Sequence, residues 1–292
     1  MKVAVYGRSF DKSFKEYIFS FFDNLEQNAV KISIHQDFYD FLTNEINFKP
    51  KSAIVFKNYS ELKKDTDLLF SIGGDGTILD AITLVRDSGI PIVGINTGKL
   101  GFLASIAKDE IDMALTAIYE NDYTIEERTV LKIDAPSQVF GDFPYCLNEV
   151  AVQKIDSAMI KVHVHIDGEF LNTYWSDGLI ISTPTGSTAY SLSVGGPIII
   201  PNSGNFIISP ISPHNLTVRP IVLPDTSKIQ LKLESKALNY IASLDHRSVV
   251  IKNTDELLIQ KADFKINLLK LNSTSFYKTL RNKLMWGADK RN

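Results

Sequence analysis

The segment from Leu68 to Asp87 constrains the fold more than any other part of the chain. Leu68–Ile72 is an apolar strand, Gly73–Thr77 reads Gly-Gly-Asp-Gly-Thr, and a helical pattern runs from Thr77 to Asp87. A strand that enters a helix through a glycine-rich turn is typical of parallel α/β sheets. Such a turn lies at the carboxyl end of its strand, where open α/β sheets bind ligands. The segment therefore predicts an α/β domain with a binding site at this turn.

Short apolar segments alternate with helical patterns through the first third of the chain. The other expected strands are Lys2–Tyr6, Lys31–His35, Ala53–Phe56 and Pro91–Ile95, and the other expected helices are Phe10–Leu25 and Gln36–Glu45. Strands and helices in this order imply a doubly wound parallel sheet, which we assign to a nucleotide-binding domain over residues 1–125.

The pattern changes near Glu126. Short strands follow with few helical periods between them, at Leu131–Ile133, Glu149–Gln153, Lys161–Ile166, Glu169–Trp175, Gly178–Ser182, Ile229–Leu233 and Val249–Lys252. They predict a mainly β domain over residues 126–270. A helical period returns in Thr274–Leu284, and we expect residues 271–292 to pack back on the first domain.

Composition excludes several classes of protein. The chain has 292 residues, 44% of them hydrophobic and 22% charged, which is typical of a globular protein. Its formal net charge of −3, without a basic tract, favours neither nucleic acid nor an anionic membrane as a partner. Cys146 is the only cysteine, so an internal disulfide and a cysteine-based zinc site are excluded. With no signal-peptide pattern and no long apolar stretch, we expect a cytoplasmic protein.

The turn Gly73–Thr77 carries the first candidate chemistry. Three glycines let a phosphate approach the backbone, and the N–H groups of the following helix favour an anion. Asp75 is unusual in a phosphate-binding turn unless it handles a proton or a metal ion. As an isolated residue it could equally be a helix cap. The string fits neither common nucleotide motif, because Leu79 stands at the third Rossmann glycine position. A second glycine-rich run, Gly94–Gly101, is expected to border the same crevice.

A second candidate segment begins at Asp177. The strand Gly178–Ser182 leads into Thr183–Tyr190, which reads Thr-Pro-Thr-Gly-Ser-Thr-Ala-Tyr and is followed by Ser193. Hydroxyls and small side chains of this kind can bind a ribose and the edge of a base. In isolation, the same composition is also that of a plain turn.

Taken together, these segments resemble the NAD kinase family. The shared residues are the Gly-Gly-Asp-Gly-Thr turn at Gly73–Thr77, the run Ile95–Leu103, the pair Asn148-Glu149 and the intact Thr183–Tyr190 stretch. The resemblance implies an N-terminal domain similar to those of phosphofructokinases and diacylglycerol kinases, a β-rich C-terminal domain, and NAD bound between the two. It implies transfer of the terminal phosphate of ATP to the 2′-hydroxyl of the adenosine ribose of NAD, yielding NADP. The resemblance further implies that Mg²⁺ is carried with ATP and that the chain forms a homodimer or homotetramer.

The resemblance also implies roles for particular residues. Asp75 becomes the catalytic carboxylate, and Gly74, Gly76 and Thr77 border the phosphates. The residues implied to bind the dinucleotide are Asn148, Glu149, Thr185, Thr188, Ala189, Tyr190 and Ser193, with Asn148 near the adenine. Asp177 is implied to reach the nicotinamide end, often across a subunit interface.

The chain departs from the commoner family pattern at Asp245-His246-Arg247, where many members have Asp-Gly-Gln. His246 is therefore either a phosphate contact or a surface-turn histidine, and a neutral imidazole is a weak partner for an anion.

Two other functions fit part of the sequence. A lipid or sphingoid-base kinase would share the Gly73–Thr77 turn, but it has no use for the hydroxyl-rich Thr183–Tyr190 segment. A regulatory module that senses NADP would share the binding residues, but it has no use for an intact Asp75. An assay of ATP-dependent NADP formation separates the three.

Overall fold

The computed structural model describes residues 1–51, 53–62, 65–135, 137–234 and 238–286. The chain forms two compact units: unit 1 comprises Met1–Glu127 and Ile266–Asn292, and unit 2 comprises Arg128–Lys265. Two long strands, β6 (Tyr123–Ala135) and β17 (Glu256–Leu271), contribute residues to both units.

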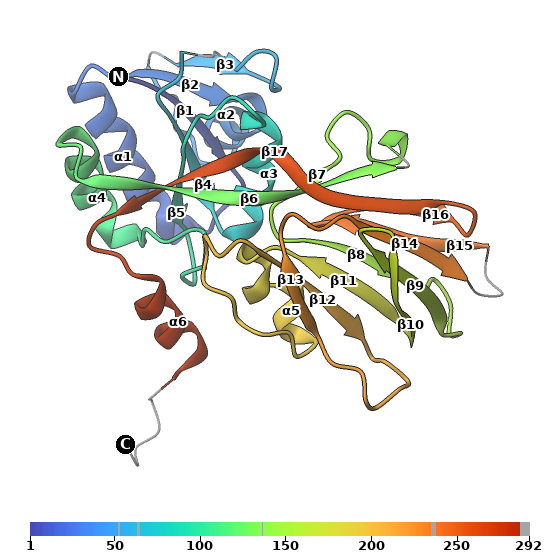
Figure 1. The fold of residues 1–292 in the computed structure, drawn as a ribbon. Helices are drawn as coiled ribbons and strands as arrows, with labels where there is room; N and C mark the ends of the chain where they lie inside the picture. Colours follow the sequence, from blue (N-terminus) through green and yellow to red (C-terminus); the bar gives the residue numbers. More distant parts are fainter. Residues whose placement is uncertain (52, 63–64, 136, 235–237, 287–292) are drawn as a thin grey trace. The chain divides into compact units, whose positions relative to one another are not determined.

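Unit 1 is built on a parallel sheet with the strand order β3-β2-β1-β4-β5, and the end of β17 pairs with β5 (Figure 1). Its strands are β1 (Lys2–Gly7), β2 (Lys31–His35), β3 (Ile54–Phe56), β4 (Leu68–Gly73) and β5 (Ile92–Asn96). Its helices are η1 (Lys12–Phe14), α1 (Lys15–Gln27), α2 (Gln36–Asn44), α3 (Asp75–Val85), η2 (Lys108–Glu110), α4 (Ile111–Tyr119) and α6 (Phe276–Leu284). The order confirms a doubly wound sheet.

The buried strand β4 explains how unit 1 is layered. Side chains alternate across a strand, and Leu68, Phe70 and Ile72 enter one apolar core with residues of α1, α2 and α4. The helix α3 follows β4 directly and packs against β4 and β5. Since β4 has no exposed residue, both of its faces are covered, as expected for a central parallel strand.

Unit 2 consists of two sheets packed over a second core. One sheet is antiparallel, with the order β13-β12-β11-β8-β15-β16, and the other contains β10, β9, β14 and the first part of β17. The bounds are η3 (Ser137–Phe140), β7 (Tyr145–Cys146), β8 (Glu149–Gln153), β9 (Ile160–Ile166), β10 (Glu169–Ser176), β11 (Gly178–Ser182), η4 (Thr185–Thr188), α5 (Tyr190–Ser193), β12 (Asn205–Ile211), β13 (Ile221–Pro224), β14 (Ile229–Glu234), β15 (Asn239–Leu244) and β16 (Arg247–Lys252). The expected combination of an α/β unit and a mainly β unit is confirmed.

Several boundaries differ from the sequence-based expectation for local reasons. The first long helix starts at Lys15 rather than Phe10, because Asp11 caps the short helix η1 by accepting a hydrogen bond from the Ser13 N–H at 2.9 Å. The helix after the glycine-rich turn starts at Asp75 rather than Thr77. The tail helix α6 belongs to unit 1, where Lys283 lies over the Phe102 ring at 5.6 Å from its centre. Among the described residues, no helix is long and apolar enough to cross a bilayer.

Candidate active site

The Gly73–Thr77 turn joins the end of β4 to the start of α3. Thr77 is buried and its Oγ1 accepts a hydrogen bond from the Gly74 N–H at 3.2 Å, so it closes the turn from within. A side chain on Gly73 would collide with Thr77, since a Cβ there would lie 2.1 Å from Oγ1. At Gly74 and Gly76, by contrast, a Cβ would meet no heavy atom within 4 Å. These two glycines therefore leave the backbone open to an approaching group.

The Asp75 carboxylate is held by the second glycine-rich run. Its Oδ2 accepts a hydrogen bond from the Phe102 N–H at 2.8 Å, and its Oδ1 accepts from Leu103 and Ala104 at 3.0 and 2.9 Å. Gly101 makes the approach possible, because a Cβ there would lie 1.8 Å from Asp75 Oδ1. The sequence indicated that the two glycine-rich runs border one crevice, and in the structure they are in direct contact.

Asn96 shapes the second run from within, and Thr97 ties it to the end of β4. Its side-chain Nδ2 donates to the Lys99 carbonyl at 2.8 Å, and its Oδ1 accepts from the Gly98 N–H at 2.7 Å. The next residue, Thr97, donates its backbone N–H to the Gly73 carbonyl at 3.0 Å. The position of the Asp75 carboxylate is thus fixed from the helix and from the facing loop.

In unit 2, Asn148 and Glu149 lie at the start of β8, and both are buried. Asp245 holds this segment: its carboxylate accepts hydrogen bonds from the N–H groups of Leu147, Asn148 and Glu149 at 3.0, 2.7 and 3.3 Å. The Asp245 N–H donates in turn to the Glu149 carbonyl at 3.0 Å. With a φ of 54° in the turn between β15 and β16, Asp245 has a backbone conformation that Asp tolerates better than most residues.

Glu149 is the titratable group most perturbed by this arrangement. Burial, reinforced by the neighbouring Asp245 carboxylate, raises the pKa of Glu149 from 4.5 to about 8. Its Oε2 is buried and has no hydrogen-bond partner among the described residues. Burial likewise raises the pKa of Asp245, although three backbone N–H donors oppose that shift. A backbone hydrogen bond from Tyr190 opposes the shift at Glu149, and the net rise in pKa favours the protonated form of Glu149, which can donate a hydrogen bond.

The Thr183–Tyr190 segment folds as the short helix η4 and the start of α5, directly after β11. Two of its hydroxyls, on residues that were not predicted to bind the ligand, donate to backbone carbonyls of unit 2. Thr183 Oγ1 donates to the Leu147 carbonyl at 2.6 Å, and Ser187 Oγ donates to the Pro184 carbonyl at 2.7 Å. Gly186 lies against Asn148, since a Cβ there would be 2.2 Å from the Asn148 carbonyl oxygen. The segment is packed onto the residues that Asp245 holds.

The remaining predicted residues lie around this packed segment. Thr188, Ala189 and Tyr190 are partly exposed, and Ser193 is exposed. Tyr190 accepts a hydrogen bond at its hydroxyl from Gln153 Nε2 at 2.8 Å. Thr185 and the partly exposed residues thus belong to the same short segment, which packs on Asn148 through Gly186.

Asp177 and His246 have different surroundings. Asp177 lies between β10 and β11 and forms an ion pair with Lys154, with Oδ1 and Nζ 2.6 Å apart. The partner is a residue of a neighbouring segment, which inspection of the Asp177 stretch alone does not reveal. His246 is exposed in the same hairpin turn as Asp245.

Two residues near this region were not predicted from the sequence. Arg128 is a buried cation on β6 whose Nη1 lies 3.5 Å from Thr185 Oγ1. Arg247 donates to the Phe143 carbonyl at 2.8 Å and also to the Tyr145 carbonyl, so it fixes the segment before Asn148. Arg128 follows Glu126 and Glu127 and precedes the expected strand Leu131–Ile133, so its local sequence carried little signal of burial. Arg247 offered none, because its partners are more than 100 residues away.

Comparison with known proteins finds related sequences for both units. Two family models match the chain: the ATP-NAD kinase N-terminal domain over residues 21–123 and the ATP-NAD kinase C-terminal domain over residues 147–271. The NAD kinase of Cytophaga hutchinsonii is 44% identical over 293 residues, and that of Flavobacterium psychrophilum is 45% identical over 295 residues. Each alignment covers 100% of both chains.

Two solved structures match most of the chain in fold. An NAD kinase from Archaeoglobus fulgidus, in complex with ATP, matches with a TM-score of 0.74 and 25% identity, covering 98% of this chain and 99% of that one. Yeast NADH kinase complexed with NADH matches in fold with a TM-score of 0.84 at 24% identity, covering 99% of this chain and 88% of that one. The fold and its Gly-Gly-Asp-Gly-Thr turn thus define a kinase that acts on a small molecule. Given the family models and the relatives, the chain belongs to the NAD kinase family.

Proposed function

We propose that this chain transfers the terminal phosphate of ATP to the 2′-hydroxyl of the adenosine ribose of NAD, forming NADP and ADP. Membership of the family supports the reaction as a whole. The observation that carries the mechanism is the arrangement of the Asp75 carboxylate beside the open glycines Gly74 and Gly76.

Asp75 has one acceptor position left for a substrate hydroxyl. A carboxylate offers about four lone-pair sites, two on each oxygen. Oδ1 uses two, for Leu103 and Ala104, and Oδ2 uses one, for Phe102. The remaining site on Oδ2 can accept the proton of the ribose hydroxyl. The hydroxyl oxygen then bonds to the γ-phosphorus, the bond from that phosphorus to the bridging oxygen breaks, and ADP leaves.

The other residues bind and orient the two substrates. Gly74 and Gly76 leave room for phosphate oxygens at the backbone of the turn. For the dinucleotide we propose Asn148, Glu149, Thr185, Thr188, Ala189, Tyr190 and Ser193 at the adenosine, Asp177 at the nicotinamide end and His246 at a phosphate. Thr77 supports the turn by its hydrogen bond with Gly74. Mg²⁺ enters as part of the ATP substrate and offsets the phosphate charge during transfer.

Two broader statements accompany this proposal. As in the family it resembles, the chain is proposed to work as a homodimer or homotetramer, with Asp177 at or near a subunit interface. It is proposed to act in the cytoplasm, since its single, buried cysteine is compatible with a reducing compartment.

A direct assay tests the proposed reaction. Purified protein is incubated with Mg²⁺, ATP and NAD, and NADP is measured with an NADP-specific dehydrogenase. NADP that accumulates only when ATP is present supports the proposal. Phosphorylation of a diacylglycerol or sphingoid base in place of NAD would instead identify a lipid kinase, and tight NADP binding without turnover would identify a sensing module.

A further inference from the structure

The strand order of unit 1 reverses direction between β1 and β4. From β1 the chain builds outward through β2 and β3, and from β4 it builds in the opposite direction to β5. Open α/β sheets bind ligands outside the carboxyl ends of the two strands at such a switch point. The carboxyl end of β4 leads into the Gly73–Thr77 turn. The carboxyl end of the neighbouring β1 forms the other side of the switch point.

Arg8 is the first residue after β1. Gly7, the last residue of β1, is in register with Ile72, and the Arg8 N–H donates to the Ile72 carbonyl at 3.2 Å. The next residue on β4 is Gly73, which starts the glycine-rich turn. The backbone of Arg8 is thereby fixed beside this turn, while its side chain is 54% exposed.

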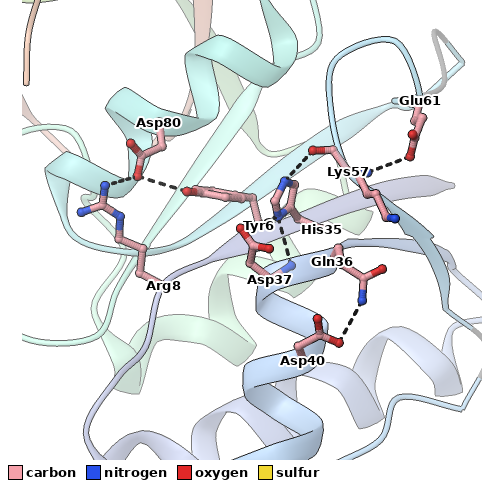
Figure 2. Close-up of polar contacts among 9 residues, drawn as sticks. All are labelled: Tyr6, Arg8, His35, Gln36, Asp37, Asp40, Lys57, Glu61 and Asp80. Atoms are coloured by element: carbon pink, nitrogen blue, oxygen red, sulfur yellow. Dashed lines mark hydrogen bonds and ion pairs between the residues drawn. The ribbon is translucent and has the colours of Figure 1, made fainter. Parts of the chain in front are cut away.

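Asp80 on α3 determines the direction of the Arg8 side chain. Arg8 Nη2 lies 2.5 Å from Asp80 Oδ2, and the Tyr6 hydroxyl donates to the same oxygen at 3.1 Å (Figure 2). Burial and the neighbouring Asp80 raise the pKa of Tyr6 to about 12, in keeping with a hydroxyl that donates to this carboxylate. Asp80, with a side chain only 15% exposed, is thus a fixed anchor for a half-exposed guanidinium.

Stability alone does not account for this arrangement. An ion pair with one exposed partner contributes little to folding. A guanidinium has five N–H donors in a planar fork that matches phosphate oxygens, and its contacts with Asp80 and Tyr6 engage some of these donors but not the whole fork. Arginine held at a sheet switch point, beside two glycines that leave the backbone open, is suited to a polyphosphate.

We propose that Arg8 binds the phosphates of ATP and that Asp80 is the residue that positions it. This inference rests on the proposed kinase function and adds a residue to it. The ligand chemistry is that of a nucleoside triphosphate with its divalent metal ion. NAD has no part in the contact, so the two substrates are expected to respond differently to changes at Arg8.

The test compares Arg8, which pairs with Asp80 in the middle of α3, with Arg86 at the carboxyl end of the same helix. Arg8→Gln removes the positive charge at the switch point. Arg86→Gln removes a positive charge at the carboxyl end of α3, where the Arg86 Cζ lies 4.9 Å from the centre of the Tyr59 ring. Affinity for Mg²⁺ with a non-hydrolysable ATP analogue is measured by calorimetry, and KM for ATP and for NAD by initial rates. Arg8→Gln should weaken analogue binding and raise KM for ATP by about tenfold or more, with KM for NAD unchanged. Arg86→Gln should change neither value.

Two further variants separate the roles of the pair. Arg8→Lys keeps the charge but not the fork, and should recover only part of the loss. Asp80→Asn should raise KM for ATP in the wild-type background and have no further effect once Arg8 is Gln, since it acts through Arg8. Additive losses in the double variant would overturn the positioning role of Asp80.

The outcomes also distinguish this inference from the function on which it rests. Analogue affinity within twofold of wild type in a folded Arg8→Gln protein would overturn the role of Arg8, whatever the rate of NADP formation. Wild-type protein that binds the ATP analogue but makes no NADP would overturn the proposed function. In that case the calorimetric comparison of Arg8→Gln with Arg86→Gln still decides whether Arg8 binds phosphate.

Discussion

Asp75 in unit 1 and Asp245 in unit 2 are held in the same way. Each carboxylate accepts hydrogen bonds from three consecutive backbone N–H groups, those of residues 102–104 for Asp75 and residues 147–149 for Asp245. In both cases one oxygen takes two of the bonds and the other takes one. The hydrogen-bond pattern therefore does not distinguish a carboxylate that reacts from one that positions its neighbours.

The surroundings of the two carboxylates differ. Asp75 is flanked by Gly74 and Gly76, where a side chain would meet only open space. Asp245 lies against the buried Glu149, and desolvation raises the pKa of both groups. We infer that Asp75 acts on a substrate, whereas Asp245 orients Asn148 and Glu149. The predictions below test this contrast.

The largest effect is expected for Asp75→Asn. Loss of a positioned general base lowers turnover by about 10²–10⁴-fold, while the dissociation constant for NAD should change far less. Asparagine keeps one acceptor oxygen for Leu103 and Ala104 but presents an N–H group to the Phe102 N–H, so stability should fall by about 1–3 kcal/mol. Rates, NAD affinity and melting temperature are measured on one preparation. Loss of a general base should lower turnover by more than about tenfold. Turnover above about a tenth of wild type would therefore make Asp75 a structural residue like Asp245.

Gly101→Ala should damage the same carboxylate from the opposite side. Its new Cβ would lie 1.8 Å from Asp75 Oδ1, so either the carboxylate or the loop must move. A displacement of about 1 Å can cost about 10²-fold in rate. Gly98→Ala in the same run is the matched control, since a Cβ there meets nothing within 4 Å. Equal turnover in the two variants would show that the position of Asp75 is unimportant.

Asp245→Ala should affect binding more than chemistry. It leaves the N–H groups of residues 147–149 without their acceptor, at about 1–3 kcal/mol for each group that stays buried. KM for NAD should rise about tenfold to a hundredfold, with kcat much less affected than in Asp75→Asn. Asn148→Ala is the control, because it removes one proposed contact to the ligand and should raise KM for NAD without lowering the melting temperature. A loss of kcat in Asp245→Ala as large as that in Asp75→Asn would remove the contrast between the two residues.

The same contrast explains what the sequence could and could not predict. The strand, turn and helix around Asp75 are contiguous, so apolar periodicity and glycine chemistry were sufficient to locate them. Asp245 is 97 residues from Asn148 in the chain, and no local pattern reports that contact. The sequence drew attention to Asp245-His246-Arg247 only as a departure from a family pattern, without indicating that its first residue holds the Asn148-Glu149 pair.

The sequence also could not predict which side chains of a turn face inward and which face solvent. The hydroxyls of Thr183 and Ser187 are hydrogen-bonded inside the turn, while the partly exposed side chains of Thr188 and Tyr190 share the same residue types and spacing. Composition predicts a hydroxyl-rich turn but not which hydroxyls face a ligand. The strand β17 was missed for a different reason, since the polar pair Gln260-Lys261 breaks the phase of its apolar alternation. Tertiary packing supplies that information.

The smallest effect is a pH dependence that originates at Glu149. Its pKa is about 8 in the folded protein against an ordinary value of 4.5, so the folded state binds the proton more tightly than the unfolded state. The protonated group therefore contributes stability that is fully present below about pH 4.5 and is lost as pH rises through about 8. The free energy of unfolding should fall by at most about 1.4 kcal/mol per pH unit in this window.

Glu149→Gln isolates this contribution, because glutamine has similar size and does not titrate. Denaturant unfolding of both proteins is measured from pH 5.5 to 9, and wild type should lose stability relative to Glu149→Gln as pH rises. Asp245→Asn removes the neighbouring negative charge that helps to raise the pKa of Glu149, so in that background the relative loss should be complete at a lower pH. Parallel curves for wild type and Glu149→Gln would show that Glu149 is ionised when folded. In that event Asp245 and Asp75 would differ only in the residues that they hold, and not in the electrostatics of their surroundings.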